Sequence, residues 1–119
     1  MTTWCNEDTP LIWGELLHRI AALGSGVVFE GRDTLLEQIM QPAGFRRLQD
    51  YLAERPPRDE VHRRRIAAAF LNRYAVDDRM EEEVDLPGWS EDYVEALSRA
   101  YDADMEAVAR VPGVRFVAP

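Results

Sequence analysis

Two pairs of residues have the spacing that metal-binding helices use. Glu15 precedes His18 by three positions, and Asp59 precedes His62 by three. On a helix this spacing puts a carboxylate and an imidazole on one face, and di-iron bundles combine two such pairs with two further glutamates. Here an aspartate replaces the glutamate of the second pair, and Asp59 lies where a helix cap is expected. We therefore interpret both histidines as surface residues beside acids and predict no metal site.

The lone cysteine, Cys5, is the only thiol that could act as a nucleophile. A reactive cysteine needs a nearby base and a lowered pKa, and the chain offers only His18 and His62. We interpret Cys5 as a packing residue beside Trp4, and a single cysteine fits a reducing compartment. The sequence therefore predicts no catalytic residue and no cofactor, and it favours a protein that is not an enzyme by itself.

A run of arginines forms the densest positive patch of the chain. It consists of Arg58, Arg63, Arg64 and Arg65. Neighbouring residues of a helix point in different directions, so the run makes a phosphate or sulfate site only if it converges with arginines of the preceding helix. The alternative is a solvated face that balances nearby carboxylates. No glycine-rich phosphate loop accompanies the run.

Three tryptophans are expected on or beside loops and helix starts. They are Trp4, Trp13 and Trp89. One interpretation is a single aromatic cluster that closes the domain. The other is that an exposed tryptophan anchors a partner, because Trp and Arg dominate the hot spots of interfaces. These three residues are the predicted partner-binding residues.

Composition excludes several classes of function. The chain has 119 residues and a net charge of −8, and all 14 of its basic residues are arginine. An acidic chain without lysine is a poor candidate for direct nucleic-acid binding, which neutralises phosphates with Lys and Arg. Its acidity aids solubility or attracts a basic partner. Because it shows neither a signal-peptide pattern nor an apolar run of about 20 residues, we predict a cytoplasmic protein without a membrane partner.

Helical periodicity and capping residues predict four or five helices. The first begins at Thr9-Pro10, with Thr9 as cap, and the second is a short helix from Asp33 or Thr34 to Met40. A third follows Pro42, and a fourth begins after Asp59 and runs toward Tyr74. The first helix is expected to bury Trp13, Leu16, Leu17 and Ile20.

The last third of the chain carries the clearest local signals. Ser90 is expected to cap a helix of about five turns that ends before Pro112-Gly113. Its buried face is predicted to consist of Tyr93, Val94, Leu97, Tyr101, Met105 and Val108.

Two apolar stretches predict short strands, residues 27–29 and 114–117, which could pair with each other. Residues 76–85 are expected to form an exposed acidic connector that contains at most a helical turn. The sequence therefore predicts a mainly α fold, a compact bundle of four to five helices with one or two short strands. We expect a single domain over residues 1–119.

The last third of the chain contains Leu86-Pro87-Gly88-Trp89, then Leu97, Tyr101, Asp104 and Val108, then Val111 to Phe116. This pattern resembles the closing helix and strand of some bacterial sulfotransferase-like proteins. The segment from Trp4-Cys5 to Trp13 and the helix with Arg63-Arg64-Arg65-Ile66 extend the likeness. The resemblance implies descent from an α/β enzyme that transfers a sulfuryl group. The cofactor loop of that fold is absent here, so no catalytic residue is carried over.

These observations favour a non-catalytic, acidic helical interaction or accessory domain that binds another protein, or itself as a homodimer. One alternative is the C-terminal portion of a sulfotransferase-like enzyme without its cofactor loop. A second alternative is an acidic inhibitor that mimics nucleic acid. An interaction domain should expose an apolar patch, a mimic should carry rows of acids, and an enzyme remnant should show arginines converging in a concavity.

Overall fold

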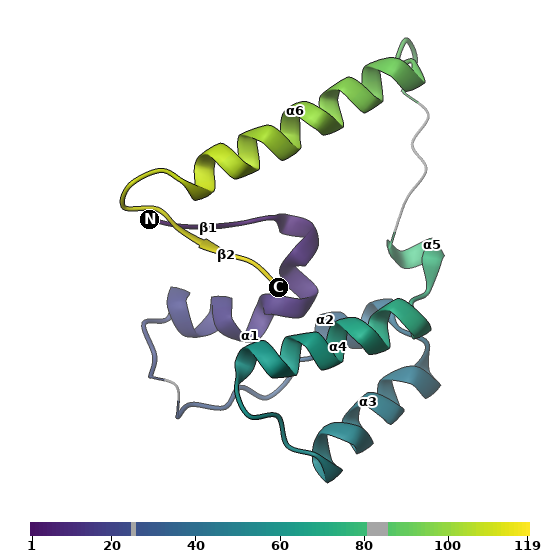
Figure 1. The fold of residues 1–119 in the computed structure, drawn as a ribbon. Coiled ribbons are helices and arrows are strands. Elements are labelled where there is room, and N and C mark those ends of the chain that lie inside the picture. Colours follow the sequence, from purple (N-terminus) through teal and green to yellow (C-terminus); the bar gives the residue numbers. More distant parts are fainter. Residues whose placement is uncertain (25, 81–85) are drawn as a thin grey trace. The chain divides into compact units, whose positions relative to one another are not determined.

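A computed structural model describes residues 1–24, 26–80 and 86–119. The fold is mainly α, as the sequence predicts, with 64% of the described residues in helices. The described part contains nine elements (Figure 1). In chain order they are β1 (Thr2–Trp4), the 3-10 helix η1 (Asn6–Asp8), α1 (Thr9–Ile20), α2 (Thr34–Ile39), α3 (Pro42–Glu54), α4 (Glu60–Tyr74), α5 (Asp77–Met80), α6 (Glu91–Ala109) and β2 (Arg115–Val117).

The described residues divide into two compact units. The helical unit consists of residues 6–80, and the terminal unit consists of residues 1–5 with residues 86–118. Units of this size occur within one domain as well as in separate domains. The single domain expected over residues 1–119 therefore stays a prediction.

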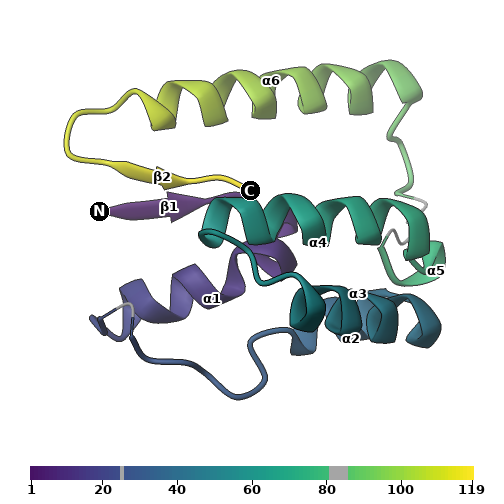
Figure 2. The ribbon, with the colours of Figure 1, turned by 60° about the horizontal axis from the view of Figure 1, so that its bottom comes forward.

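The helical unit has a continuous hydrophobic core. Helices α3 and α4 lie side by side (Figures 1 and 2), and α2 contributes Leu36 to their core. The buried side chains of this core are Leu36, Met40, Phe45, Leu48, Ala67 and Leu71. Helix α1 also buries Ile12 and Leu16, which are 0% and 1% exposed. Ile20, at the end of α1, is 69% exposed where burial was predicted.

The links that follow α2 and α4 are joined by backbone hydrogen bonds. The amide of Gln41 donates to the carbonyl of Tyr74 at 2.7 Å, and the amide of Val76 donates to the carbonyl of Ile39 at 2.9 Å. Gly44 lies beneath Tyr74, where a Cβ atom would come within 2.3 Å of the Tyr74 Cβ. Only a glycine allows α3 and α4 to approach this closely.

Two of the predicted helix caps are confirmed. The Asp59 carboxylate accepts a hydrogen bond from the His62 amide at 2.7 Å at the start of α4. The Ser90 hydroxyl accepts one from the Tyr93 amide at 3.2 Å at the start of α6. The cap predicted at Thr9 is wrong, because Thr9 is already the first residue of α1 and the preceding residue makes no side-chain cap bond.

One predicted strand is confirmed and the other is wrong. Strand β2 covers Arg115–Val117, but residues 27–29 form no strand. The partner of β2 is β1, in a parallel register that places Thr3 opposite Phe116 and Trp4 opposite Val117. The expected pairing of residues 27–29 with β2 is therefore wrong. Three residues are too short a run to show strand alternation, so the sequence pattern missed β1.

The acidic connector lies partly within the described residues. Its expected helical turn is α5, Asp77–Met80, whereas residues 81–85 lie outside the described part of the chain. In the described residues, no helix combines the length and the apolar character needed to cross a membrane.

Candidate functional site

A charged pocket of about 580 Å³ lies in the helical unit, among α1, α4 and the chain between α1 and α2. Its size is typical of small-molecule sites. The wall combines charged and aliphatic side chains, and we call it the charged pocket. The lining residues are Glu15, His18, Arg19, Leu23, Val27, Val28, Arg32, Asp59, Glu60, Val61 and Arg64.

Ion pairs hold the walls of the charged pocket together. Glu15 of α1 accepts a hydrogen bond from Arg64 of α4 at 2.6 Å and also pairs with Arg19, one turn further along α1. Arg32, in the chain between α1 and α2, donates to Glu60 at 2.7 Å. Three separate segments of the chain thus meet through carboxylate–guanidinium contacts, which are stronger than neutral hydrogen bonds.

Glu15 is the shared acceptor of this network. Burial alone would raise the pKa of its carboxyl, but the hydrogen bonds and positive charges of Arg19 and Arg64 outweigh burial and lower that pKa below its ordinary value. Among the residues that the structure describes, Arg64 is the one charged residue that is buried, with 8% of its surface exposed. A buried arginine requires such a partner, because removing the carboxylate would leave an uncompensated charge.

The four arginines predicted to bind an anion lie in different surroundings. Arg64 lines the charged pocket, whereas Arg63 donates to Asp33 at 2.6 Å and Arg58 and Arg65 are exposed. Of the four, Arg64 alone belongs to the pocket wall. Anion binding by the whole run stays a prediction, and the fold gives it no common concavity among these residues.

The two histidine pairs have structural partners. The Glu15 carboxylate is occupied by arginines, and the Asp59 carboxylate caps α4. The His18 ring contacts the Phe29 ring edge-on with centroids 4.9 Å apart, and His62 Nδ1 accepts a hydrogen bond from the Arg58 amide. Among the described residues, no group of three or more His, Cys, Asp or Glu side chains could hold a metal ion.

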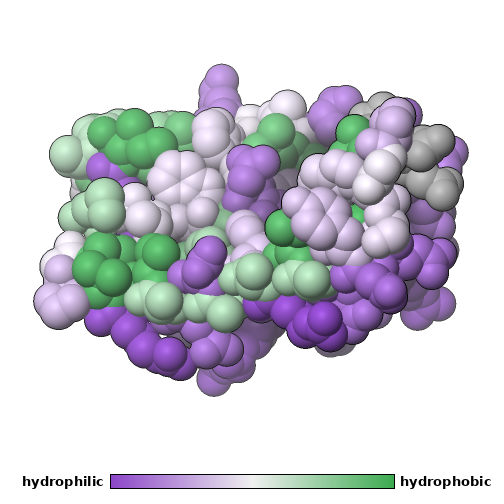
Figure 3. Space-filling view, turned by 90° about the horizontal axis from the view of Figure 1, so that it is seen from above, coloured by the Kyte–Doolittle hydropathy of each residue, from purple (hydrophilic) through white to green (hydrophobic). Residues whose placement is uncertain are grey.

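Helix α6 carries a second candidate site, on the terminal unit. Most of the face predicted to be buried is exposed: Tyr93, Val94 and Leu97 are 49%, 45% and 38% exposed, and α6 contains no buried residue. Towards the end of the helix, Met105 and Val108 are half-buried. We call this face the α6 stripe, and it consists of Tyr93, Val94, Leu97, Tyr101, Met105 and Val108. Figure 3 shows apolar and pale aromatic residues gathered on one face, with hydrophilic residues along its border.

The charged residues of α6 are distributed unevenly. On the face opposite the stripe, Arg99 pairs with Glu95 at 2.7 Å and Arg110 pairs with Glu106 at 2.9 Å. Asp104 has a different position, because it lies three residues after Tyr101 and four before Val108, within the stripe itself. The stripe is therefore apolar with an acidic residue near one edge.

The three tryptophans have different exposures. Trp89, which precedes α6, is 49% exposed, and its ring contacts Tyr93 edge-on at 5.3 Å between centroids. Trp4 in β1 and Trp13 in α1 are half-buried. Trp89 thus extends the α6 stripe at its N-terminal end. Partner binding by each of the three stays a prediction, and the exposed ring of Trp89 has the character of an anchor.

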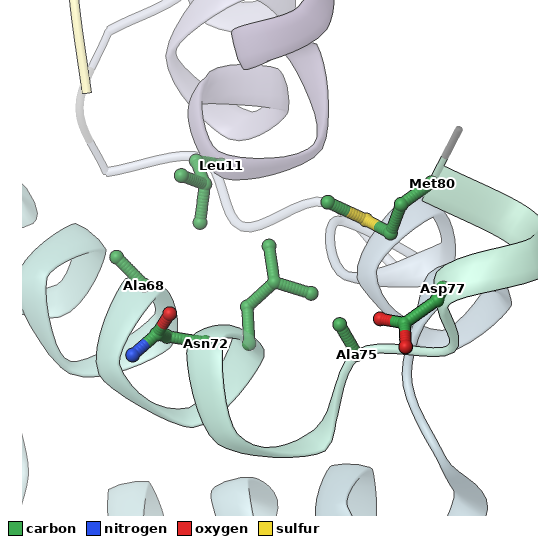
Figure 4. Close-up of a pocket in the computed structure, with 7 residues that line it drawn as sticks. Leu11, Ala68, Asn72, Ala75, Asp77 and Met80 are labelled. Atoms are coloured by element: carbon green, nitrogen blue, oxygen red, sulfur yellow. The ribbon is translucent and has the colours of Figure 1, made fainter.

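The helical unit also contains an apolar pocket of about 410 Å³ (Figure 4). Leu11 and Met80 point into the space above α4, and Asn72 and Asp77 lie at its rim. Nothing in the described chain indicates what would occupy it. Cys5 lies in the terminal unit, is half-buried and has a free thiol.

Sequence reasoning missed most of the charged pocket. Arg19 and Arg32 were not predicted to belong to a site, and residues 27–29 were expected in a strand. The one available signal was the i, i+4 spacing of Glu15 and Arg19, which predicts an ion pair on one helix face. The contacts that bring Arg32 and Arg64 to the same hollow span 28 and 49 residues of sequence and leave no local pattern.

Compared with protein-family models, with curated proteins and with solved structures, the chain matches none of them. The likeness to sulfotransferase-like proteins therefore rests on the residues of this sequence alone.

Proposed function

We propose that this chain is a protein-interaction domain that binds its partner through the α6 stripe and Trp89. The observation that supports this proposal is the exposure of five aromatic or aliphatic side chains, which are 38–49% exposed along one face of α6 and in the turn before it. They are Trp89, Tyr93, Val94, Leu97 and Tyr101. Contiguous apolar surface of this kind marks interaction sites on proteins.

The charges around the stripe indicate the chemistry of the partner. The arginines of α6 pair with glutamates on the opposite face, whereas Asp104 lies on the side of the stripe and the first turn of the helix carries Glu91 and Asp92. A second copy of this chain would bring the same acids and would be repelled. We therefore infer a different protein, with an amphipathic helix whose apolar residues are flanked by Lys or Arg.

Site-specific photo-crosslinking tests this proposal. A photoreactive phenylalanine derivative placed at Tyr101 is expected to capture a partner in a lysate of the native host. The same group placed at Ala103, exposed on the other side of α6, is the matched control and should capture nothing. The captured protein should carry a basic amphipathic segment at the crosslinked site. Equal capture from both positions, or none from Tyr101, would contradict the proposal.

Affinity measurements with the captured partner then separate apolar from electrostatic binding. Leu97→Asp is expected to weaken binding by roughly 10- to 100-fold. The complex should persist in about 1 M salt, where the Debye length is about 3 Å. An adduct of twice the mass of the chain would instead indicate a homodimer.

The two alternative functions stay predictions and give different results in the same experiments. A nucleic-acid mimic would lose its partner in high salt and would be insensitive to Leu97→Asp, because its acids would provide the binding energy. A portion of a sulfotransferase-like enzyme would use converging arginines and would be unaffected by changes in the α6 stripe.

A further inference from the structure

Three arginines lie over aromatic rings on helices α3 and α4. The guanidinium carbon of Arg55 is 5.4 Å from the centre of the Tyr51 ring. Those of Arg47 and Arg73 are 5.8 and 5.6 Å from the centre of the Tyr74 ring, and Arg47 also donates to the Tyr74 hydroxyl at 2.8 Å. All three distances are within the range of a cation–π interaction. These contacts position the guanidinium groups, so less side-chain freedom is lost when they bind a ligand.

The aromatic rings connect the three arginines into one cluster across the two helices. The Phe70 ring of α4 is 5.6 Å from the Tyr51 ring of α3 and 6.2 Å from the Tyr74 ring, measured between centroids. We call this group of side chains the arginine–aromatic cluster: Arg47, Tyr51, Arg55, Phe70, Arg73 and Tyr74. Its rings are half-buried and its arginines are exposed. The cluster belongs to the helical unit and shares no residue with the α6 stripe.

The cluster lies in a positively charged part of an acidic chain. Residues 42–74 contain eight arginines and four carboxylates, which gives this segment a charge of +4 in a chain of −8. Two arginines and two carboxylates of the segment have partners of their own: Arg63, Arg64, Asp59 and Glu60. The other two carboxylates, Asp50 and Glu54, form no ion pair with the cluster arginines in the described structure. The cluster therefore has an excess of positive charge for an anionic partner.

The geometry of the cluster favours carboxylates over nucleic acid. A guanidinium group presents a planar fork that matches the two oxygens of a carboxylate. Single-stranded nucleic acid binds by stacking its bases on the faces of aromatic rings, but guanidinium groups already lie over Tyr51 and Tyr74. It would also bring a phosphate on every nucleotide toward a chain of charge −8. A short segment with a few carboxylates suffers less repulsion.

We infer that the arginine–aromatic cluster binds an extended acidic segment of another protein. Arg47 and Arg55 are eight residues apart on α3, which separates their positions along the helix axis by about 12 Å. Residues i and i+4 of an extended peptide are about 13 Å apart and point to the same side. Two carboxylates with this spacing reach both arginines, and an apolar residue midway between them contacts Phe70. In the described structure, Phe70 is the ring of the cluster that has no guanidinium group over it.

Titration of the full chain with a short synthetic peptide, followed by amide chemical shifts, tests this inference. The peptide carries two glutamates at positions i and i+4 and a leucine at i+2, in a background of glycine and serine. We expect saturable binding with a Kd of about 0.1–1 mM at low salt, with shifts concentrated on α3 and α4. The same peptide with glutamines in place of both glutamates should bind at least about tenfold more weakly, because it makes no charge-assisted hydrogen bonds.

Variants connect this binding to the cluster. Arg55→Gln should weaken peptide binding by about five- to tenfold, whereas Arg65→Gln should leave the Kd within about twofold. Arg65 is exposed on α4 outside the cluster, so this control removes the same charge from the same segment. Arg55→Lys keeps the charge but loses the fork, and it should weaken binding by about threefold. Because both positions are exposed, the variants should stay folded, and thermal unfolding checks this.

Several results would overturn the inference. They are equal binding of the glutamine peptide, equal effects of Arg55→Gln and Arg65→Gln, shifts located away from α3 and α4, or tighter binding of a single-stranded oligouridylate, which would indicate a nucleic-acid site.

Salt and the α6 variant separate this inference from the proposed function. The peptide complex should be lost in about 1 M salt, where the complex proposed for the α6 stripe should persist. Leu97→Asp should leave peptide binding unchanged. Failure of one proposal is therefore distinguishable from failure of the other.

Discussion

The helical unit and the terminal unit differ in whether the apolar residues of their helices are covered. In the helical unit, α3 and α4 bury Leu48, Ala67 and Leu71 against each other. In the terminal unit, α6 is the longest helix and has no buried residue, although its apolar residues recur with the same spacing. An apolar stripe therefore indicates that a helix needs a covering surface, and it does not indicate that the same chain provides it.

The two units also differ in which parts of the chain their ion pairs connect. The helical unit joins its segments through ion pairs between residues far apart in sequence, such as Arg64 with Glu15 and Arg63 with Asp33. Within α6, Arg99 with Glu95 and Arg110 with Glu106 join residues four apart on one helix. The first kind fixes tertiary structure, whereas the second kind stabilises a helix by only a few tenths of a kcal/mol.

The largest expected difference comes from removing equivalent leucine side chains in the two units. Leu48→Ala should lower the free energy of unfolding by about 2–5 kcal/mol, because Leu48 is 1% exposed in the core. Leu97→Ala on the α6 stripe should change it by no more than about 0.5 kcal/mol. Denaturant unfolding followed by circular dichroism measures both. Equal losses would show that the α6 stripe is buried in the isolated protein.

Replacing Glu15 should reveal the long-range ion pairs of the helical unit. Glu15→Gln is expected to lower the free energy of unfolding by about 1.5–3 kcal/mol at pH 7, since charge-assisted bonds to Arg19 and Arg64 are weakened. Glu95→Gln on α6 is the matched control and should cost about 0.5 kcal/mol or less.

The effect of Glu15→Gln should depend on pH in a defined direction. The pKa of Glu15 in the folded chain lies below the ordinary 4.5, so its contribution is complete above that value and is lost as the pH falls through the folded pKa. The stability difference between wild type and variant should shrink below about pH 4.5. A difference that grows on acidification would contradict the ion-pair assignment.

Substitutions at two glycines test how closely the helices of the helical unit pack. Gly44→Ala should destabilise the protein by about 1–3 kcal/mol, because the new Cβ would clash with the Cβ of Tyr74. Gly14→Ala should cost less, because its new Cβ would meet only the flexible end of Arg32, at 2.9 Å. Thermal unfolding of both variants ranks them. A more stable Gly44→Ala protein would mean that helix propensity outweighs packing here.

The smallest expected effects concern the two confirmed caps. Asp59→Ala and Ser90→Ala should each cost about 0.5–2 kcal/mol of helix stability. In the helical unit this loss should lower the midpoint of global unfolding. In α6 it should appear as faster amide exchange in the first turn, because the helix contributes little to a core. Faster exchange confined to the first turn of α4 in Asp59→Ala would contradict this difference.

The elements of the fold were largely predictable, whereas the candidate sites were not. The start of α4 after Asp59 and of α6 after Ser90 follows from cap chemistry, which depends on residues three positions apart. Strand β1 escaped prediction because its stability depends on pairing with β2, more than a hundred residues away. The charged pocket escaped prediction because Arg32 and Arg64 meet only after α1 and α4 have packed.

The sequence by itself determined where the helices begin and which side of each is apolar, since both properties arise from neighbours within one or two turns. Tertiary structure decided which apolar sides are covered, which strand partners β2, and which arginines share Glu15. Those outcomes depend on contacts between segments that are far apart in sequence. The loop-closure entropy and the packing energy of such contacts produce no periodic pattern in the sequence. The α6 stripe shows the difference: its spacing is visible in the sequence, and its exposure only in the fold.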